Sequence, residues 1–311
     1  METLEVQMGW TQSKEAVARR CWATFFRCIA LMLALVSVAS PQDIPAVAHS
    51  PILHPWLDAR VPAEALETRI SPPTGYRRTE VPEGSFAQWL RRLPLKKDCP
   101  PVLLFNGEKK TNQAAHVAVV DLDVGPKNLQ QCADAVIRLR AEWQFAEGKH
   151  DEIRFSLTSG AQAEFARWAE GYRPVVGRRN AVTWIKSADA DASYASFRRY
   201  LDQVFQFAGT ASLSRELLKV PDPGDVRSGD VFIRGGYPGH AAIVLDVAEN
   251  VAGQRVFLLA QSYMPAQEVH ILKNPNDGNL SPWYSADYGE HLLTPEWTFG
   301  RGELRRFPSQ R

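Results

Sequence analysis

The stretch GDVFIRGGYPGHAAIVLD, residues 229–246, carries the strongest structural signal in the sequence. Gly229 and Asp230 precede a short apolar run, a glycine-rich gap follows, and His240 starts a second apolar run. Apolar, β-branched runs separated by a few residues that include glycine are typical of a β-hairpin. A similar run, AAHVAVVDLDVG around His116, lacks the preceding Gly-Asp strand. The pattern predicts two adjacent strands and leaves open whether His240 is a catalytic base or a structural hairpin residue.

Helical segments dominate the first part of the remaining sequence, and strand-like segments dominate the second. The spacing of apolar residues predicts helices over residues 85–95, 127–146, 161–173, 193–209 and 212–220. Apolar, β-branched runs predict strands over residues 101–105, 115–124, 152–160, 255–264 and 268–274. Ser193 is expected to cap its helix. Because helices and strands do not alternate regularly, we expect an α+β fold with helices packed on a mainly antiparallel sheet.

The N-terminal segment has the character of an export signal. Arg19, Arg20 and Arg27 precede an uncharged apolar run over residues 28–39, and small-residue sites follow. A basic region, a short apolar region and a small-residue site describe a secretory signal peptide. An uncleaved membrane anchor is the alternative, but a span needs about 20 apolar residues. The sequence predicts a periplasmic or secreted protein with no stable membrane span after cleavage.

We divide the chain accordingly into a signal peptide and leader (residues 1–48), a Pro-rich lead-in (49–82) and a single α+β domain (83–308). The formal net charge is +1, and the sequence has no basic run typical of a nucleic-acid partner. It also lacks a zinc signature, a phosphate loop and a dinucleotide fingerprint, so we expect no metal and no other cofactor. After cleavage the chain would keep two cysteines, Cys99 and Cys132.

The segment GDVFIRGGYPGHAAIVLDVAENVAGQRVFLLAQSY resembles the second half of papain-like amidases of the CHAP and NlpC type. The resemblance implies a papain-like portion over about residues 128–272. It implies that His240 is the catalytic base and that Gln261 or Ser262 orients the imidazole ring. Such a base needs a nucleophile within hydrogen-bond reach. Cys132 precedes His240 in the papain-like order and lies early in a predicted helix, whose dipole would favour a thiolate.

Three roles stay open for Cys132: a nucleophile, a buried core residue about five residues into its helix, or a disulfide partner of Cys99. Ser212 is a rival nucleophile, although a serine before a short helix is more often an N-cap. Aromatic and polar side chains next to the predicted site could bind substrate, and the candidates are Ser262, Tyr263 and Trp283.

Nearly all of the chain after the leader, about residues 72–308, resembles the bacterial family DUF4846. The matching stretches are GSFAQWLRRLPL, LQQCADAVIRLRAE, GDVFI…GHAAIVLD, LLAQSYMPAQEVHIL and SPWY. This resemblance supplies a family and no activity. Together the patterns predict an exported cysteine amidase or peptidase with the catalytic residues Cys132, His240 and Gln261, acting on cell-wall peptide, an exported protein or a similar amide. The alternative is a non-catalytic periplasmic binding or scaffold protein with a degenerate papain-like fold.

Overall fold

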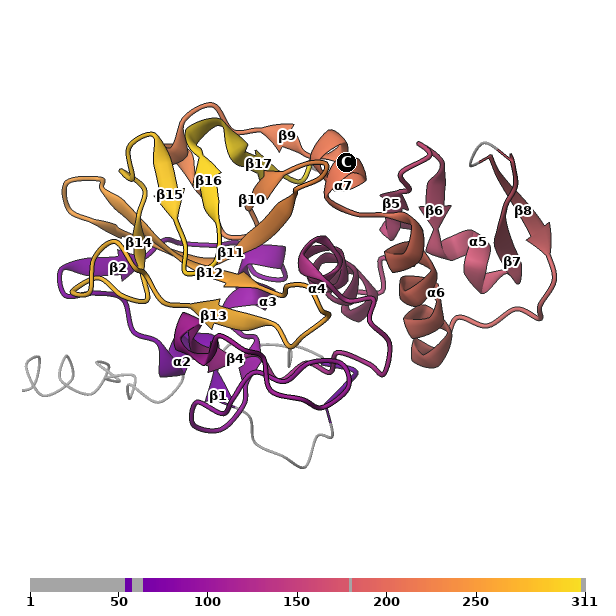
Figure 1. Cartoon of the computed structure of the whole chain (residues 1–311), viewed down its shortest axis with the longest axis horizontal. Helices are drawn as coiled ribbons and strands as arrows, with labels where there is room; N and C mark the ends of the chain where they lie inside the picture. Colours follow the sequence, from indigo (N-terminus) through magenta and orange to yellow (C-terminus); the bar gives the residue numbers. More distant parts are fainter. Residues whose placement is uncertain (1–53, 58–63, 179–180, 309–311) are drawn as a thin grey trace, which may run out of the picture. The chain divides into compact units, whose positions relative to one another are not determined.

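The computed structural model describes residues 54–57, 64–178 and 181–308 (Figure 1). The chain divides into two compact units, Met1–Pro51 and Ile52–Arg311, and the described residues all belong to the second. The predicted signal peptide lies outside the described residues, so its cleavage and the export of the protein remain predictions.

A nine-stranded antiparallel sheet forms the centre of this unit. Its main path has the strand order β4-β13-β12-β11-β10-β17-β9, while β14 pairs with β12 and β2 pairs with β11. The strands are β2 (Tyr76–Arg78), β4 (His116–Val119), β9 (Leu218–Lys219), β10 (Val231–Arg234), β11 (His240–Asn250), β12 (Arg255–Gln261), β13 (His270–Leu272), β14 (Tyr284–Ser285) and β17 (Leu304–Arg306). The predicted hairpin is confirmed as β10 and β11, with Arg234 opposite His240.

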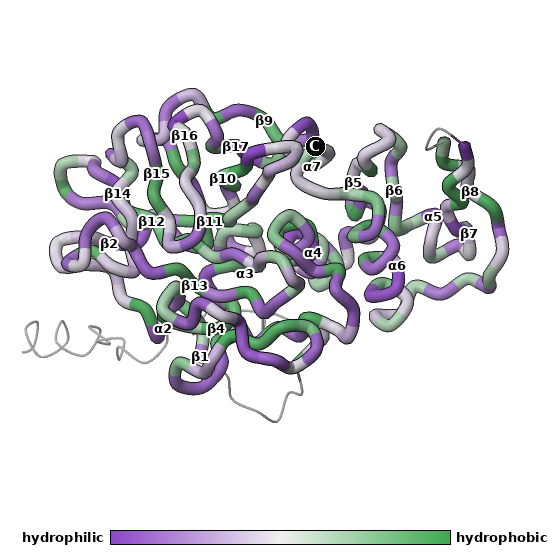
Figure 2. Tube along the Cα trace, in the orientation of Figure 1, coloured by the Kyte–Doolittle hydropathy of each residue, from purple (hydrophilic) through white to green (hydrophobic). Residues whose placement is uncertain are grey.

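Strand β11 is buried on both faces, which explains its nearly continuous apolar sequence. On one face Ala241 and Ile243 join a large apolar cluster that includes residues of two helices, α3 (Phe86–Arg91) and α4 (Cys132–Ala146). On the other face Ala242 and Val244 join a second apolar cluster. Figure 2 shows hydrophobic segments along α4 and along sheet strands beside it. The sheet therefore lies between two apolar layers, and α4 is held against β11.

A further group of elements lies between α4 and α7 (Thr210–Glu216) in the sequence, and Figure 1 shows α4 between this group and the large sheet. The group contains two hairpins and two helices: β5 (Arg154–Ser156), β6 (Gln162–Glu164), α5 (Phe165–Ala169), β7 (Tyr172–Val176), β8 (Val182–Lys186) and α6 (Tyr194–Phe207). The oxygen of Ser193 accepts a hydrogen bond from the Ser196 N–H at 3.2 Å, which confirms the predicted N-cap. Smaller pairings join β1 (Glu64–Ala65) to β3 (Pro94–Leu95) and β15 (His291–Leu293) to β16 (Thr298–Gly300). The α+β class is confirmed.

The structure corrects several predicted elements. The predicted helix over 127–146 begins only at Cys132, because Gln131 is extended and its N–H donates to Asp134 Oδ2 at 3.0 Å. Residues 101–105 form no strand and make only isolated bridges, such as Leu104 with Gln267. The predicted helix over 161–173 is a short strand, β6, followed by the five-residue α5.

The Pro-rich lead-in assigned to residues 49–82 contributes to the folded unit. It supplies the four-residue helix α2 (Leu66–Arg69), whose Leu66 is fully buried, and strand β2, which pairs with the far end of β11. Prolines prevent long helices, but three- and four-residue elements fit between them. The folded unit therefore begins before residue 83.

Candidate functional site

Cys132 and His240 line the same pocket, which has a volume of about 560 Å³. The pocket lies where the start of α4 meets the start of β11, and its walls come from residues within 128–134, 205–210, 236–240 and 263–264, together with Trp297. The residues expected to act as nucleophile and base, 108 positions apart in the sequence (240 minus 132), are thus brought to one cavity.

Cys132 is the first residue of α4, not a residue one turn further in. The first N–H groups of a helix have no partner within the helix, so the thiol lies at the positive end of the helix dipole. Burial nevertheless raises the pKa of the Cys132 thiol to about 11, and the Asp134 carboxyl raises it too. Backbone N–H groups of Ala133, Ala241 and Cys132 itself favour the thiolate, but they offset only part of this. The resting thiol is therefore protonated at neutral pH.

Neither cysteine in the described part of the chain forms a disulfide. Cys99 and Cys132 are both free, and Cys99 is exposed whereas Cys132 is partly buried. The disulfide that the sequence left open is not formed. Cys132 is consequently available for chemistry within the pocket.

His240 is the first residue of β11 and is 1% exposed. Its Nε2 lies 2.8 Å from Gln261 Oε1 at the end of the neighbouring strand β12. Burial lowers the pKa of His240 to about 4, the hydrogen bond to Gln261 raises it in part, and the positive charge of Lys110 lowers it further. The imidazole is therefore neutral at pH 7.

The tautomer of His240 follows from the orientation of the Gln261 amide. Gln261 Nε2 donates a hydrogen bond to Glu296 Oε2 at 2.8 Å, and a carboxylate can only accept. The amide nitrogen must therefore face Glu296, which leaves the amide oxygen facing His240. His240 Nε2 carries the proton, and Nδ1 is left as the unprotonated nitrogen.

Three further residues support this arrangement and were not found from the sequence. Lys110, only 6% exposed, forms an ion pair with Glu296. His270 donates from Nδ1 to the carbonyl of Glu268 at 2.9 Å, so its Nε2 can accept from Lys110 Nζ at 3.4 Å. Burial and the charge of Lys110 lower the pKa of His270 to about 3. Lys110 and Glu296 thus form a charged pair behind Gln261, and His270 is a neutral acceptor beside it.

Aromatic rings enclose the imidazole of His240. The ring centroids of Tyr263, Trp297 and Phe299 lie 4.6, 5.2 and 5.8 Å from it. Tyr263 lines the pocket, as expected of a residue that contacts substrate, and Trp297 lines it without having been predicted. These rings exclude water from the imidazole, which explains its low pKa.

Two of the residues predicted to bind substrate have structural roles instead. Ser262 is fully buried, and its Oγ lies 2.9 Å from the Gln130 carbonyl and 2.7 Å from the Gln267 carbonyl. Trp283 is 1% exposed within the core, and its indole N–H donates to the Ser71 carbonyl at 2.9 Å. Neither residue lines the pocket.

The rival nucleophile Ser212 is also structural. It is fully buried in the first turn of α7, where its hydroxyl oxygen accepts from the Gly209 N–H at 3.1 Å. His116, the other strand-leading histidine, has its Nε2 3.0 Å from the Pro100 carbonyl. Both side chains therefore make local backbone contacts.

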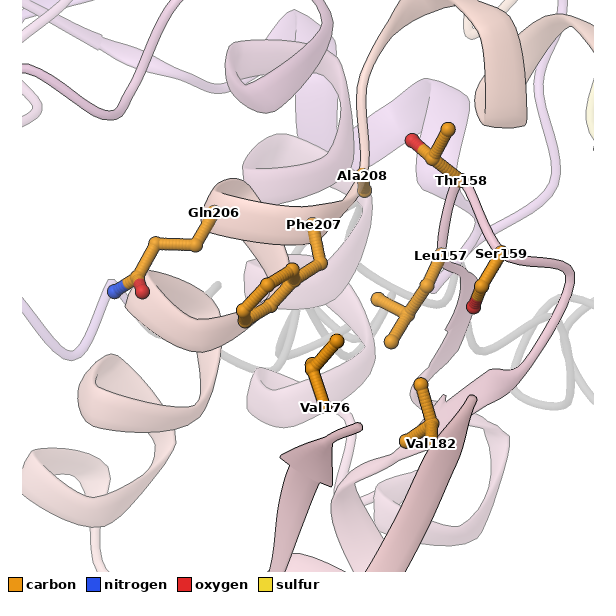
Figure 3. Close-up of a pocket in the computed structure, with 8 residues that line it drawn as sticks. All are labelled: Leu157, Thr158, Ser159, Val176, Val182, Gln206, Phe207 and Ala208. Atoms are coloured by element: carbon orange, nitrogen blue, oxygen red, sulfur yellow. The ribbon is translucent and has the colours of Figure 1, made fainter. Parts of the chain in front are cut away.

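A second cavity, of about 160 Å³, lies beside the end of α6 (Figure 3). Leu157, Val176, Val182 and Phe207 give it apolar walls, and none of its eight lining residues has a titratable side chain. It offers no acid or base that could activate its two hydroxyl groups, those of Thr158 and Ser159. Among the described residues, moreover, no group of three or more His, Cys, Asp or Glu side chains is placed to hold a metal ion.

The protein is thus an α+β protein with one pocket lined by Cys132 and His240, and Gln261 contacts His240. The family model described as "Domain of unknown function (4846)" matches residues 66–306, which is more than half of the chain. The chain therefore belongs to the DUF4846 family, as its sequence resemblance indicated. No curated protein and no solved structure matches it significantly. Within residues 54–57, 64–178 and 181–308, no helix combines the length and the apolar character needed to cross a membrane.

Proposed function

We propose that the protein is a thiol-dependent amidase or peptidase in which Cys132 attacks, His240 transfers the proton and Gln261 orients the imidazole. The observation that carries the proposal is the shared pocket, in which a cysteine at a helix start faces the same cavity as a histidine of fixed tautomer. A nucleophile, a base and a group that orients the base are the parts that such chemistry needs. The order of the three residues along the chain, and the sequence over 229–263, resemble papain-like amidases.

The proposed reaction balances without a cofactor. His240 Nδ1 removes the thiol proton while the sulfur of Cys132 bonds to the amide carbon, and backbone N–H groups at the start of α4 stabilise the oxyanion. The intermediate then collapses, the C–N bond breaks, and the amine leaves with the proton from His240. Water, deprotonated by the same nitrogen, hydrolyses the thioester and regenerates the thiol.

The pKa values of the pair specify the type of catalysis. A thiol with a pKa of about 11 and an imidazole with a pKa of about 4 in the same pocket are both neutral at pH 7 and do not form a thiolate–imidazolium ion pair. Proton transfer must then accompany attack on the substrate, as in general-base catalysis. The same observation favours a second candidate, a binding protein that keeps the pocket without turnover, because a neutral, buried thiol is a weak nucleophile.

We further propose that the protein acts outside the cytoplasm, on cell-wall peptide or another exported amide. The proposal rests on the basic and apolar residues of the segment 1–48, which lies outside the described part of the chain. Detection of the processed protein in a periplasmic or extracellular fraction would support it, and a full-length cytoplasmic form would contradict it.

The test of the activity compares wild type with Cys132→Ser and His240→Gln, using the release of free amines from purified peptidoglycan. Cys99→Ser is the matched control, because Cys99 is also a free thiol but is exposed and does not line the pocket. We expect the two pocket variants to lose roughly 100-fold or more of the activity and the control to retain it. Equal release by wild type and Cys132→Ser would refute a role for the thiol.

A further inference from the structure

The pocket around Cys132 and His240 contains almost no charge. Of the described residues that line it, none is a lysine or an arginine, and Asp134 is the only acidic one. Asp134 is 6% exposed, and its burial raises the pKa of its carboxyl to about 8. This carboxyl is therefore mostly protonated at neutral pH, so the pocket presents no full charge to a ligand.

Two cations close to residues of the pocket are already paired with acidic partners. Lys110 forms an ion pair with Glu296, which accepts from Gln261. Arg234 lies 5.6 Å from the centre of the Trp297 ring, and its guanidinium binds both carboxylate oxygens of Glu303. A carboxylate that entered the pocket would lose hydration and would meet no cationic side chain, and the partial positive charge at the start of α4 would offset only part of that cost.

The rim of the pocket, in contrast, is apolar and exposed. Tyr237, on the glycine-rich loop just before His240, is 96% exposed, and Met264 is 57% exposed. Large apolar side chains exposed around a cavity mark a surface that contacts a ligand. Together with Trp297 they offer flat and flexible apolar surface on which a substrate side chain can pack.

We propose that the substrate of this pocket is an uncharged peptide segment, with no carboxylate on the residues flanking the reacting amide and with an apolar group packed on Tyr237 and Met264. The inference rests on the proposed function in placing the reacting amide beside Cys132. Among cell-wall peptides, such a pocket would select segments whose carboxylates are amidated or lie away from the reacting bond.

The test measures binding to the Cys132→Ser variant, so that it does not depend on turnover. The probes are two capped tripeptides, acetyl-Leu-Gln-Ala-amide and acetyl-Leu-Glu-Ala-amide, which carry the same apolar side chain, have nearly the same shape and differ by one negative charge. We expect the glutamine peptide to bind roughly tenfold more tightly than the glutamate peptide. Adding Met264→Lys should narrow this ratio, because the new ammonium group supplies the missing partner for the glutamate.

Adding Tyr237→Ala to the Cys132→Ser variant tests the rim contacts, and it should weaken the binding of the glutamine peptide roughly tenfold. Leu218→Ala is the matched control, since Leu218 is 58% exposed and lies outside the pocket. Any one of three results would overturn the inference. The glutamate peptide could bind as tightly as the glutamine peptide or more tightly, neither peptide could bind measurably, or Tyr237→Ala and Leu218→Ala could have equal effects. If the glutamine peptide binds more tightly but the wild-type protein hydrolyses no amide, only the proposed activity is refuted. If the protein hydrolyses amides but binds both peptides equally, only this inference is refuted.

Discussion

Removing the positive charge of Lys110 tests the network behind His240 most directly. The Lys110→Met variant leaves the Glu296 carboxylate unpaired. Two hydrogen bonds of 2.8 Å and the width of the Gln261 amide separate this carboxylate from His240 Nε2, about 7 Å in total. At an effective dielectric constant of about 20, one charge at that distance is worth about 2 kcal/mol, or roughly 1.5 pKa units. The negative charge favours the imidazolium. In the wild-type protein the positive charge of Lys110 offsets this attraction and lowers the pKa of His240, so removing Lys110 should raise that pKa from about 4 to between about 5 and 6.

The assay is an NMR titration of the His240 ring, assigned by the loss of its signals in His240→Gln. Breaking the buried pair should also cost about 2–4 kcal/mol of folding stability, somewhat less than for a fully buried pair, because 16% of the Glu296 side chain is exposed. Lys96→Met is the matched control, since it breaks the ion pair of Lys96 with Glu268 without touching Gln261. A His240 pKa that stays near 4 in Lys110→Met, or that moves equally in the control, would refute the network.

Three other variants or conditions give further tests. Asp134→Asn should lower the pKa of the Cys132 thiol from about 11, because it removes an acidic neighbour, and the asparagine oxygen can still accept from the Gln131 N–H. The pH dependence of Cys132 alkylation measures this pKa. Trp283→Ala should cost about 3–5 kcal/mol in thermal unfolding and leave peptide binding unchanged. His240 takes up a proton near pH 6.5 in the unfolded protein but only near pH 4 in the folded protein. The contribution of this group to the free energy of unfolding should therefore be constant above pH 6.5 and fall by about 3 kcal/mol as the pH drops to 4.

The sequence was informative wherever the signal was local. The β10–β11 hairpin follows from two apolar runs around glycine, and the Ser193 cap follows from the residue type before an amphipathic helix. For Trp283 the sequence left open whether the ring binds substrate or covers the core, because an aromatic residue in a turn-rich loop gives no indication of which neighbours cover it. The structure places Trp283 in the core, and its indole N–H binds the Ser71 carbonyl, 212 positions away.

The start of α4 was mispredicted for a reason that is visible in the structure. Residues 127–131 have helix-compatible side chains. However, Asp134 accepts a hydrogen bond from the Gln131 N–H, and this bond stabilises a helix that begins at Cys132. That shift places Cys132 at the exposed N–H end of the helix. Propensity alone does not decide between two adjacent turns, whereas one side-chain hydrogen bond does.

The supporting pair of Lys110 and Glu296 could not be found by any local pattern. The two residues lie 186 positions apart in short loops. Glu296 accepts from Gln261 at the end of β12, and Lys110 lies beside His270 on the neighbouring strand β13. Nothing in KKTNQ or TPEW distinguishes a buried ion pair from exposed charges. Their importance follows from geometry, since the pair fixes the Gln261 amide and through it the tautomer of His240.

The neutral state of the site fits both candidate functions and does not separate them. An ion pair of thiolate and imidazolium would mark the resting protein as an enzyme, but here burial holds both Cys132 and His240 uncharged, as it does Asp134. A hydrolase and a binding protein would therefore select the same uncharged ligand, since selection depends on the walls and the rim. They differ in one event, the transfer of the thiol proton to His240 Nδ1 when an amide carbon comes within reach of the sulfur. Ligand binding alone therefore does not distinguish the two functions, whereas the effect of Cys132→Ser on amine release does.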